Sequence, residues 1–440
     1  MNLDRHSVSR NLPREAAHES AGLRWIVSQE GSRQSYGVPL AFHRLGALRK
    51  FYVDTWCRRG RNILRRGPKG LRALSTHFNA ELPSERVVSF NSSVLFARAK
   101  LYFQRNGMSL EQISAEYCRF GKHFAELVRE ELKREELNPD TDAFFGFNTN
   151  CLETIEYLRG QGVFTVVDQV DPGKVEEDLC VEEAARWPGW AKTPGRMPQS
   201  YWDRLTAEWD AADAVLVNSP WSAEALIEQG VPASKIMVVP LAIDVAGGTP
   251  VADKEAAAAS LKVLWLGSVI LRKGIQYLVE AARILQKTKI EFLVAGPVGI
   301  SATAVSSFPP NMRLLGRITR DQLTEIYRQS DVFVLPTLSD GFAITQLEAM
   351  AEGLPVVVTP NCGRVVTDGV DGLIVPARNG AVLADALVRL DEDRELLQRM
   401  SANARLTVQH YNLPANGRLI QQLAAECRRP RPELTLASHA

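Results

Sequence analysis

The sequence lacks the long apolar runs and paired cysteines that mark membrane-spanning or disulfide-rich proteins. None of its 440 residues lie in a run near the roughly 18 apolar residues that a membrane span needs. Its six cysteines lie far apart without a C-x2-C pair, so neither a zinc site nor a disulfide framework is indicated. The first 20 residues mix both charge signs without an apolar stretch, unlike a secretory signal. These features predict a protein of the reducing cytoplasm.

The composition has no strong bias. A hydrophobic fraction of 45% and a charged fraction of 23% are ordinary for globular proteins, which excludes a mainly disordered or collagen-like chain. At roughly 150 residues per domain, the length predicts two or three domains.

The small net charge of +1 hides an uneven distribution. Residues 1–80 carry 15 Lys and Arg against 5 Asp and Glu, a balance of +10, so the remainder carries −9. Much of the excess lies in residues 58–72, where basic side chains alternate with Ile63, Leu64 and Leu71. Such a patch would suit an anionic membrane surface or a polyanionic substrate, and a solvated helix face is the alternative. No nucleic-acid-binding module accompanies it, so we expect no nucleic-acid partner.

Short apolar runs alternate with amphipathic stretches in the first half of the chain, a pattern typical of parallel sheets covered by helices. The predicted strands are residues 24–28, 86–90, 143–147, 163–168 and 214–219, and the predicted helices are 94–106, 109–137, 150–160 and 221–230. Residues 241–260, rich in Gly, Pro and small side chains, then interrupt the alternation as an interdomain linker would.

A second alternating series follows this interruption. Its predicted strands are residues 262–267, 290–296, 313–315, 332–336, 355–359 and 372–376, and its predicted helices are 273–287, 320–330, 342–352, 379–391, 393–409 and 416–428. Continuous apolar strands indicate burial on both faces, as in a doubly wound sheet. The sequence therefore predicts an α/β protein with two Rossmann-like domains facing across a cleft. The expected divisions are a disordered tail (1–23), a first domain (24–245), a linker (246–260), a second domain (261–412), and a helix with a mobile tail (413–440).

Two acidic residues in the segment DGFAITQLEAMAEG suggest a ligand site. Asp340 and Glu348 enclose seven residues, or roughly 12 Å of helix, which suits two hydroxyl-bearing sugars joined by a diphosphate better than a metal. We expect the helix to begin at the Gly341–Phe342 turn, so that its N–H groups and positive end face the diphosphate. Acids placed only to cap and flank the helix are the alternative.

A cationic segment upstream supports an anion site. Arg272 and Lys273 open a predicted helix, where a cation normally opposes the helix dipole, so we expect an anion there. Lys273 is the natural phosphate-binding charge, and Gly267 at the preceding strand end allows close backbone approach. Arg317 and Ile318 lie in a loop after a strand, where backbone groups could recognise a nucleobase.

These motifs in combination resemble a known family. The G-x5-K-G segment, the G-R-I loop, S-D-V-F-V-L-P, D-G-F-x5-L-E-A-M-A and D-G-V-D-G-L-I-V-P resemble the nucleotide-binding half of retaining glycosyltransferase family 4, of the GT-B fold. The resemblance covers about residues 210–410 and is to members of the bacterial polysaccharide-synthesis type.

The resemblance implies roles for individual residues. Asp340 would hold a donor-sugar hydroxyl and Glu348 the ribose, although the family has Glu at the first position. Lys273 would bind phosphate, whereas the family's Arg position is Ser268 here, with Arg272 as the available substitute. Where the family often has Glu, this chain has Arg364. The remaining donor-side residues would be Gly267, Arg317, Ile318, Gly341, Phe342, Ala343 and Ile344.

The first domain matches the family less closely. Gly31 lies in a glycine loop after the first strand, as in the family's acceptor-side loop, and His43 belongs to a Y-x-V-P-x3-H-x2-G pattern shared with similar members. A packing role is the alternative for His43. The strand end VVDQVDP offers Asp168, Gln169 and Asp171 to the reacting sugar, and spacing singles out none of them.

The resulting expectation is a metal-independent retaining glycosyltransferase that uses no cofactor. It would move a sugar from a nucleoside-diphosphate sugar to a hydroxyl of a saccharide or lipid-linked acceptor, in polysaccharide or glycolipid assembly, at the cytoplasmic face of the membrane. Lys273, Arg272 and the N–H groups at the helix start would stabilise the leaving group. Alternatives are a catalytically silent nucleotide-sugar-binding scaffold, an epimerase or phosphorylase, and a nicotinamide-dependent oxidoreductase. The last is disfavoured because no G-x-G-x-x-G follows a strand.

Overall fold

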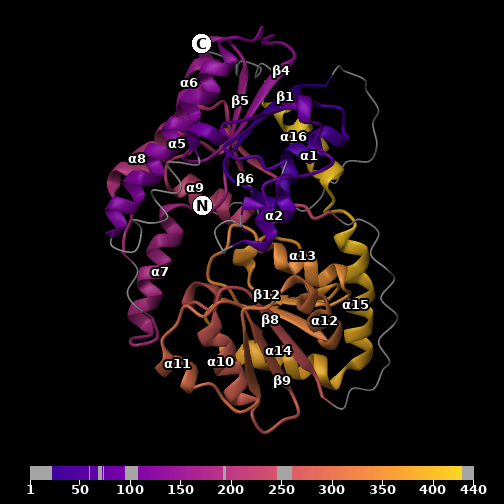
Figure 1. Ribbon diagram of the computed structural model, residues 1–440. Helices are drawn as coiled ribbons and strands as arrows, with labels where there is room; N and C mark the ends of the chain where they lie inside the picture. Colours follow the sequence, from indigo (N-terminus) through magenta and orange to yellow (C-terminus); the bar gives the residue numbers. More distant parts are fainter. Residues whose placement is uncertain are drawn as a thin grey trace, which may run out of the picture.

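Two parallel sheets, each covered by helices, make up the chain (Figure 1). The computed structural model describes residues 22–58, 60–67, 72, 74–94, 108–191, 195–244 and 260–428. Most of the helix predicted at 94–106, most of the predicted linker 246–260 and most of both predicted tails lie outside these residues. The described residues confirm the predicted fold class of two doubly wound α/β domains.

The first sheet has seven strands in the order β3-β2-β1-β4-β5-β6-β7. All neighbours pair in parallel. The bounds are β1 Arg24–Gln29, β2 Leu48–Val53, β3 Val87–Ser89, β4 Asp142–Phe147, β5 Phe164–Gln169, β6 Ala214–Val217 and β7 Ile236–Val238. The five predicted strands are confirmed, whereas β2 and β7 were not predicted.

Helices cover both faces of this sheet. One face packs on α1 (Gly37–Arg44) and the other on α5 (Leu110–Leu132), α6 (Leu152–Gly160) and α8 (Gln199–Ala211). Other elements among the described residues before the second sheet are α2 (Arg61–Arg66), α7 (Lys174–Arg186), α9 (Pro220–Glu228), and the short 3-10 helices Arg33–Tyr36, Ser84–Arg86 and Ala233–Lys235. No helix among the described residues is long and apolar enough to cross a membrane.

The second sheet has six strands in the order β10-β9-β8-β11-β12-β13. Their bounds are β8 Lys262–Leu266, β9 Glu291–Ala295, β10 Met312–Gly316, β11 Val332–Leu335, β12 Val356–Val358 and β13 Gly372–Ile374. The helices are α10 Ile275–Ile284, α11 Ala302–Ser306, α12 Arg320–Gln329, α13 Ile344–Ala351, α14 Gly380–Glu392 and α15 Arg394–Val408, with 3-10 helices at Leu271–Lys273 and Pro360–Cys362. Each predicted element of this series is present, with shifted ends.

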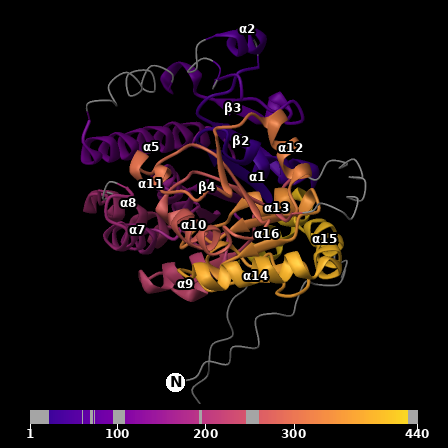
Figure 2. The same cartoon turned by 90° about the horizontal axis from the view of Figure 1, so that it is seen from below.

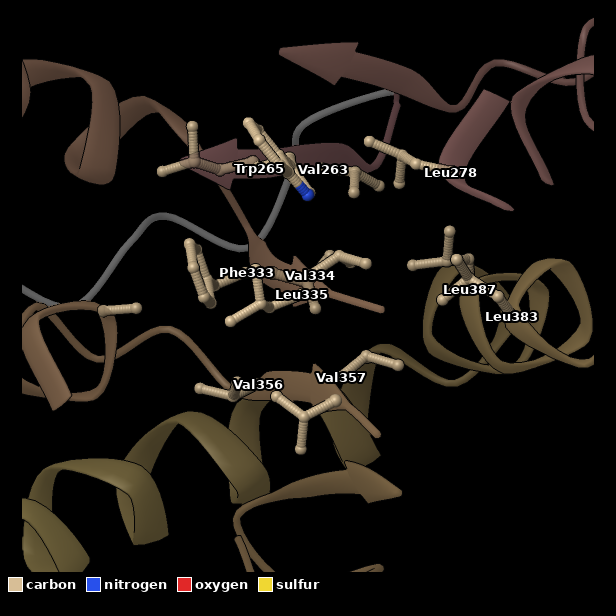
Figure 3. Close-up of a cluster of buried hydrophobic side chains, with 14 of the residues drawn as sticks. Val263, Trp265, Leu278, Phe333, Val334, Leu335, Val356, Val357, Leu383 and Leu387 are labelled. Carbon is tan, nitrogen blue, oxygen red and sulfur yellow. The ribbon is translucent and has the colours of Figure 1, made fainter. Parts of the chain in front are cut away.

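Apolar side chains from the central strands form the core of the second domain. Figure 3 shows Trp265 of β8 and Phe333 of β11, which point to opposite faces of the sheet because Phe333 pairs with Leu264, together with Leu278 of α10 and Leu383 of α14. All four side chains are buried. Strands that are apolar on both faces stay buried only between two helix layers, which explains their continuous apolar runs.

The last helix, α16 (Leu413–Arg428), returns to the first domain and packs on α1 (Figure 1). A Cβ at Gly417 would lie 2.8 Å from Leu45 Cδ1, so a glycine lets the two helices approach. The two segments that pass between the domains are also bonded together. Ile243 N donates to Tyr411 O at 2.9 Å, and Asn416 Nδ2 donates to Pro240 O at 2.7 Å.

Helix α7 follows a strand of the first sheet yet docks on the second domain; Figure 1 shows it descending beside α10 and α11. Glu183 of α7 is fully buried and accepts hydrogen bonds from Gln276 Nε2 at 2.9 Å, Arg378 Nε at 3.1 Å and the Tyr277 hydroxyl. Just beyond the helix, Trp190 O accepts from Ser301 N at 2.7 Å. The view in Figure 2 likewise places α7 close to α10.

We predict that Glu183→Ala lowers the thermal stability of the protein. The substitution leaves Arg378 and two polar side chains without their buried acceptor, a loss of about 3 kcal/mol or more. The control is Glu182→Ala, since Glu182 also binds Arg378, at 2.8 Å, but its side chain is 45% exposed. An exposed pair should cost less than about 1 kcal/mol. Calorimetric melting points that fall equally for both variants would contradict the docking role of Glu183.

Candidate active site

The 3-10 helix Leu271–Lys273 and the loop after β11 are joined backbone to backbone. Leu338 N donates to Arg272 O at 2.9 Å, and Thr337 Oγ1 donates to the same oxygen at 3.1 Å. Gly274 follows with φ +76°, and a Cβ there would lie 1.9 Å from Pro336 O. Only glycine fits both the left-handed conformation and this close approach. The cationic side chains of Arg272 and Lys273 are therefore held next to the loop that connects β11 to α13.

Three predicted catalytic residues meet at this junction. The Lys273 ammonium contacts the Asp340 carboxylate, and Arg272 Nη1 lies 4.0 Å from Asp340 Oδ1. Arg272 Nη1 also donates to Ser339 O at 2.8 Å. Burial, reinforced by the adjacent Arg272 guanidinium, lowers the pKa of Lys273 to about 8. The amine is therefore mainly cationic at neutral pH and titrates slightly above it.

The helix α13 begins at Ile344, so the prediction of a start at Gly341–Phe342 is wrong. The preceding turn is bonded instead to the segment after β12. Asp340 N donates to Asn361 O at 2.9 Å, and Ala343 N donates to Cys362 O at 3.2 Å. Gln346 Nε2 also donates to Cys362 O, at 2.7 Å. The N–H groups of Asp340 and Ala343 thus already donate hydrogen bonds to backbone carbonyl groups.

Glu348 lies on α13 and is half-buried. Its Oε2 accepts a hydrogen bond from the Tyr327 hydroxyl of α12 at 3.3 Å. Burial, with Glu348 beside it, raises the pKa of Tyr327 well above its usual value, so Tyr327 remains a donor. Tyr327 was not predicted, because it lies on a different helix from Glu348.

The other predicted donor-side residues lie on loops after neighbouring strands. A Cβ at Gly296, after β9, would lie 1.7 Å from Gly267 O, so the loops after β8 and β9 pack backbone to backbone. Gly296 N also donates to Gly316 O, at 2.7 Å, at the end of β10. Ser268 and Arg317 are exposed, and Ile318 is half-buried.

Two predicted first-domain residues lie on loops at the carboxyl edge of their sheet. Gly31 N donates to Asp54 Oδ1 at 2.9 Å, which fixes the loop after β1 to the end of β2. Asp171, after β5, accepts from Gly173 N at 2.9 Å and from Gln169 Nε2 at 2.9 Å.

Asp168, on the same strand β5, is buried, and burial raises its pKa to about 7. The Arg33 guanidinium opposes this rise, and it lies 5.6 Å from the Phe147 ring centroid. Arg33 was not predicted, although it follows the glycine loop by only two residues.

His43 is placed differently. It lies in the last turn of α1, and the chain then turns into the amino end of β2. Because β2 runs parallel to β1, this is the sheet edge opposite the loop that carries Gly31. The structure therefore does not bring His43 together with Gly31, Asp168 or Asp171.

The two domains touch at the Asp340 turn. A Cβ at Gly341 would lie 2.5 Å from Val170 O, and 3.0 Å from both Oδ1 and Nδ2 of Asn218. Beside it, Ser339 Oγ accepts from Trp221 Nε1 at 3.1 Å. The exposed Arg364 forms an ion pair of 4.0 Å with Glu224 of α9. The carboxyl edges of the two sheets therefore face each other around Asp340.

Glu176, in the first turn of α7, completes this cluster. Its Oε2 accepts from Arg272 Nη1 at 3.0 Å and from Ser339 Oγ at 2.9 Å. Glu176 and Glu183 were not predicted, although their spacing of seven residues places them on one face of a helix. Among the described residues, no group of three or more His, Cys, Asp or Glu side chains could hold a metal ion.

Comparison with known proteins agrees with this architecture. Residues 260–393 match the family model of the glycosyl transferases group 1. A relative from Paenarthrobacter aurescens, named D-inositol 3-phosphate glycosyltransferase, is 28% identical over 244 residues. That alignment spans 48% of the chain and only 60% of the relative.

Solved structures resemble the chain over most of its length. Sucrose-phosphate synthase from Thermosynechococcus elongatus superimposes with a TM-score of 0.62 at 19% identity, covering 92% of the chain and 98% of that structure. The Anabaena protein HepE, in complex with UDP, gives a TM-score of 0.55 at 14% identity, covering 92% of the chain and 100% of that structure. The chain thus has the GT-B glycosyltransferase fold, and its second domain matches the group 1 glycosyl transferases.

Proposed function

We propose that the protein transfers a sugar from a nucleoside-diphosphate sugar to an acceptor hydroxyl, with retention at the anomeric carbon. The observation that carries this proposal is the meeting of Arg272, Lys273 and Asp340 at the carboxyl edge of the second sheet. All three lie in the segment that matches the group 1 glycosyl transferases. Structures of HepE with UDP and with UDP-glucose make a uridine nucleotide the first donor to test.

In the proposed reaction, Lys273 and Arg272 stabilise the charge that develops on the departing diphosphate, a role for which we expect no metal. Asp340 must exchange its contact with Lys273 for a hydroxyl of the donor sugar, and Glu348 holds the ribose. The bond from the anomeric carbon to the diphosphate oxygen breaks while the acceptor oxygen bonds to that carbon. A donor phosphate oxygen takes the acceptor proton on the same face, as the family resemblance implies.

We assign the acceptor to the first-domain edge around Gly31, Asp168 and Asp171. Asp168, with a pKa of about 7, can both accept and donate a hydrogen bond near neutral pH. A saccharide or lipid-linked acceptor in polysaccharide or glycolipid assembly would supply the hydroxyl. His43 has no part in this proposal because of its place at the opposite sheet edge.

The donor site is tested by binding of UDP-, GDP-, ADP- and dTDP-sugars in the presence of EDTA. We predict that one donor binds and that Glu348→Ala weakens it by about tenfold, because the variant removes a charged hydrogen-bond acceptor for the ribose. Isothermal titration calorimetry measures both. The control is Glu325→Ala on α12, an exposed acid whose loss should not affect binding.

Failure of a folded protein to bind any of these donors would contradict the proposal. Binding without transfer or donor hydrolysis would instead favour the silent scaffold, an alternative motivated by Asp340 and Ser268 at positions where the family has Glu and Arg.

The lowered pKa of Lys273 predicts a pH dependence of donor binding. The protonated amine binds the diphosphate, and it is the main form only below about pH 8. Affinity for UDP-glucose should therefore be constant near neutral pH and fall by up to about tenfold per unit above pH 8. Lys273→Arg should remove this fall, since guanidinium stays charged. A profile equally flat in the wild type and the variant would contradict the role of Lys273.

We also propose that residues 58–72 rest on an anionic membrane surface at the cytoplasmic face. Arg58, Arg66 and Arg72 are exposed, and the Ile63 side chain between them is 78% exposed. Basic residues contribute about 1 kcal/mol each at such a surface, and an exposed isoleucine can insert among lipids.

Charge reversal of the basic patch should abolish sedimentation with anionic vesicles. The variant replaces Arg58, Arg61, Arg65 and Arg66 by Glu. The control reverses four exposed arginines elsewhere, namely Arg313, Arg328, Arg399 and Arg418. Unchanged vesicle binding in the first variant would eliminate the membrane proposal and weaken the case for a lipid-linked acceptor.

A further inference from the structure

A carboxylate from helix α7 binds one of the two cations assigned to the donor diphosphate. Glu176 Oε2 lies 3.0 Å from Arg272 Nη1 and 2.9 Å from Ser339 Oγ. Its side chain is 18% exposed and that of Arg272 is 22% exposed, so the pair is largely shielded from water. Shielding strengthens the attraction between the two charges.

The cluster is already balanced in charge. Arg272 and Lys273 supply two positive charges, and Glu176 and Asp340 supply two negative ones. A diphosphate that enters must therefore compete for cations that have partners, rather than fill an uncompensated positive pocket.

Glu176 is held where it can compete again after each release. It lies two turns before Glu183, whose buried bonds to Gln276, Tyr277 and Arg378 fasten α7 to the second domain. The carboxylate therefore stays near Arg272 when the guanidinium turns to another anion.

We propose that Glu176 is a positioning residue that competes with the diphosphate for Arg272 and so limits the affinity of the site for nucleoside diphosphates. This inference rests on the proposed function and goes beyond it. When Arg272 turns to the diphosphate, Glu176 loses its ion pair, which weakens binding of both donor and product. When the product leaves, Glu176 recovers Arg272.

The test uses Glu176→Gln in the full chain, with UDP as the probe. Glutamine can still accept from Arg272 and Ser339 but has no charge, so UDP should bind about fivefold more tightly by calorimetry. In steady state, the KM for the donor should fall without a rise in kcat. A merely structural role predicts weaker binding or none of these changes.

Two further variants distinguish competition for Arg272 from a general change in the electrostatic field at the site. Glu182→Gln makes the same charge change at an exposed position of the same helix, and it should alter UDP affinity by less than about twofold. In an Arg272→Met background, Glu176→Gln should no longer tighten binding, because the contested cation is absent.

Each possible result either supports or contradicts the competition between Glu176 and the diphosphate. Tighter binding that requires Arg272 supports the inference. If the wild type binds UDP and the Glu176→Gln variant binds it no more tightly, or tightens equally without Arg272, the inference alone fails. If the folded wild type binds no nucleoside diphosphate, the inference fails together with the proposed function.

Discussion

The site depends on the hydrogen bond from Leu338 N to Arg272 O. It joins the segment after β8 to the loop after β11, which are adjacent strands of the second sheet but distant in the chain. The parallel pairing of Val332 with Val263 fixes the register of these strands, so their carboxyl ends lie at the same edge. Gly274 then lets the backbone pass close to Pro336 O, which places Lys273 against Asp340.

The sequence predicted this part of the fold because it is encoded locally. Continuous apolar runs such as residues 332–335 are recognisable without their neighbours, and the edge where their loops meet follows from parallel topology. Strand β2 was not predicted, because its second and third residues are charged. Arg49 and Lys50 are satisfied by ion pairs with Glu135 and Asp142, partners that lie far along the chain.

The errors at the site have the same origin. The start of α13 is delayed because Asp340 and Ala343 bond to the segment 361–362, a contact that no pattern within residues 340–353 reveals. Helix α7 has few buried side chains of its own, so its pattern does not indicate docking. The partners of Glu176 and Glu183 include Arg272, Gln276 and Arg378 of the other domain, and the pattern within α7 does not reveal them.

The arrangement of charges also bears on one departure from the family pattern, the serine at position 268. Ser268 cannot supply the family's arginine charge, whereas Arg272 lies 4.0 Å from Asp340 and brings a guanidinium to the same cluster from a different backbone position. The Arg272 guanidinium faces the first domain, and it donates a hydrogen bond to the carboxylate of Glu176. Arg272 is thus shared between the domains, and in the proposed function occupation of the donor site would be linked through this one side chain to the contact between the two sheets.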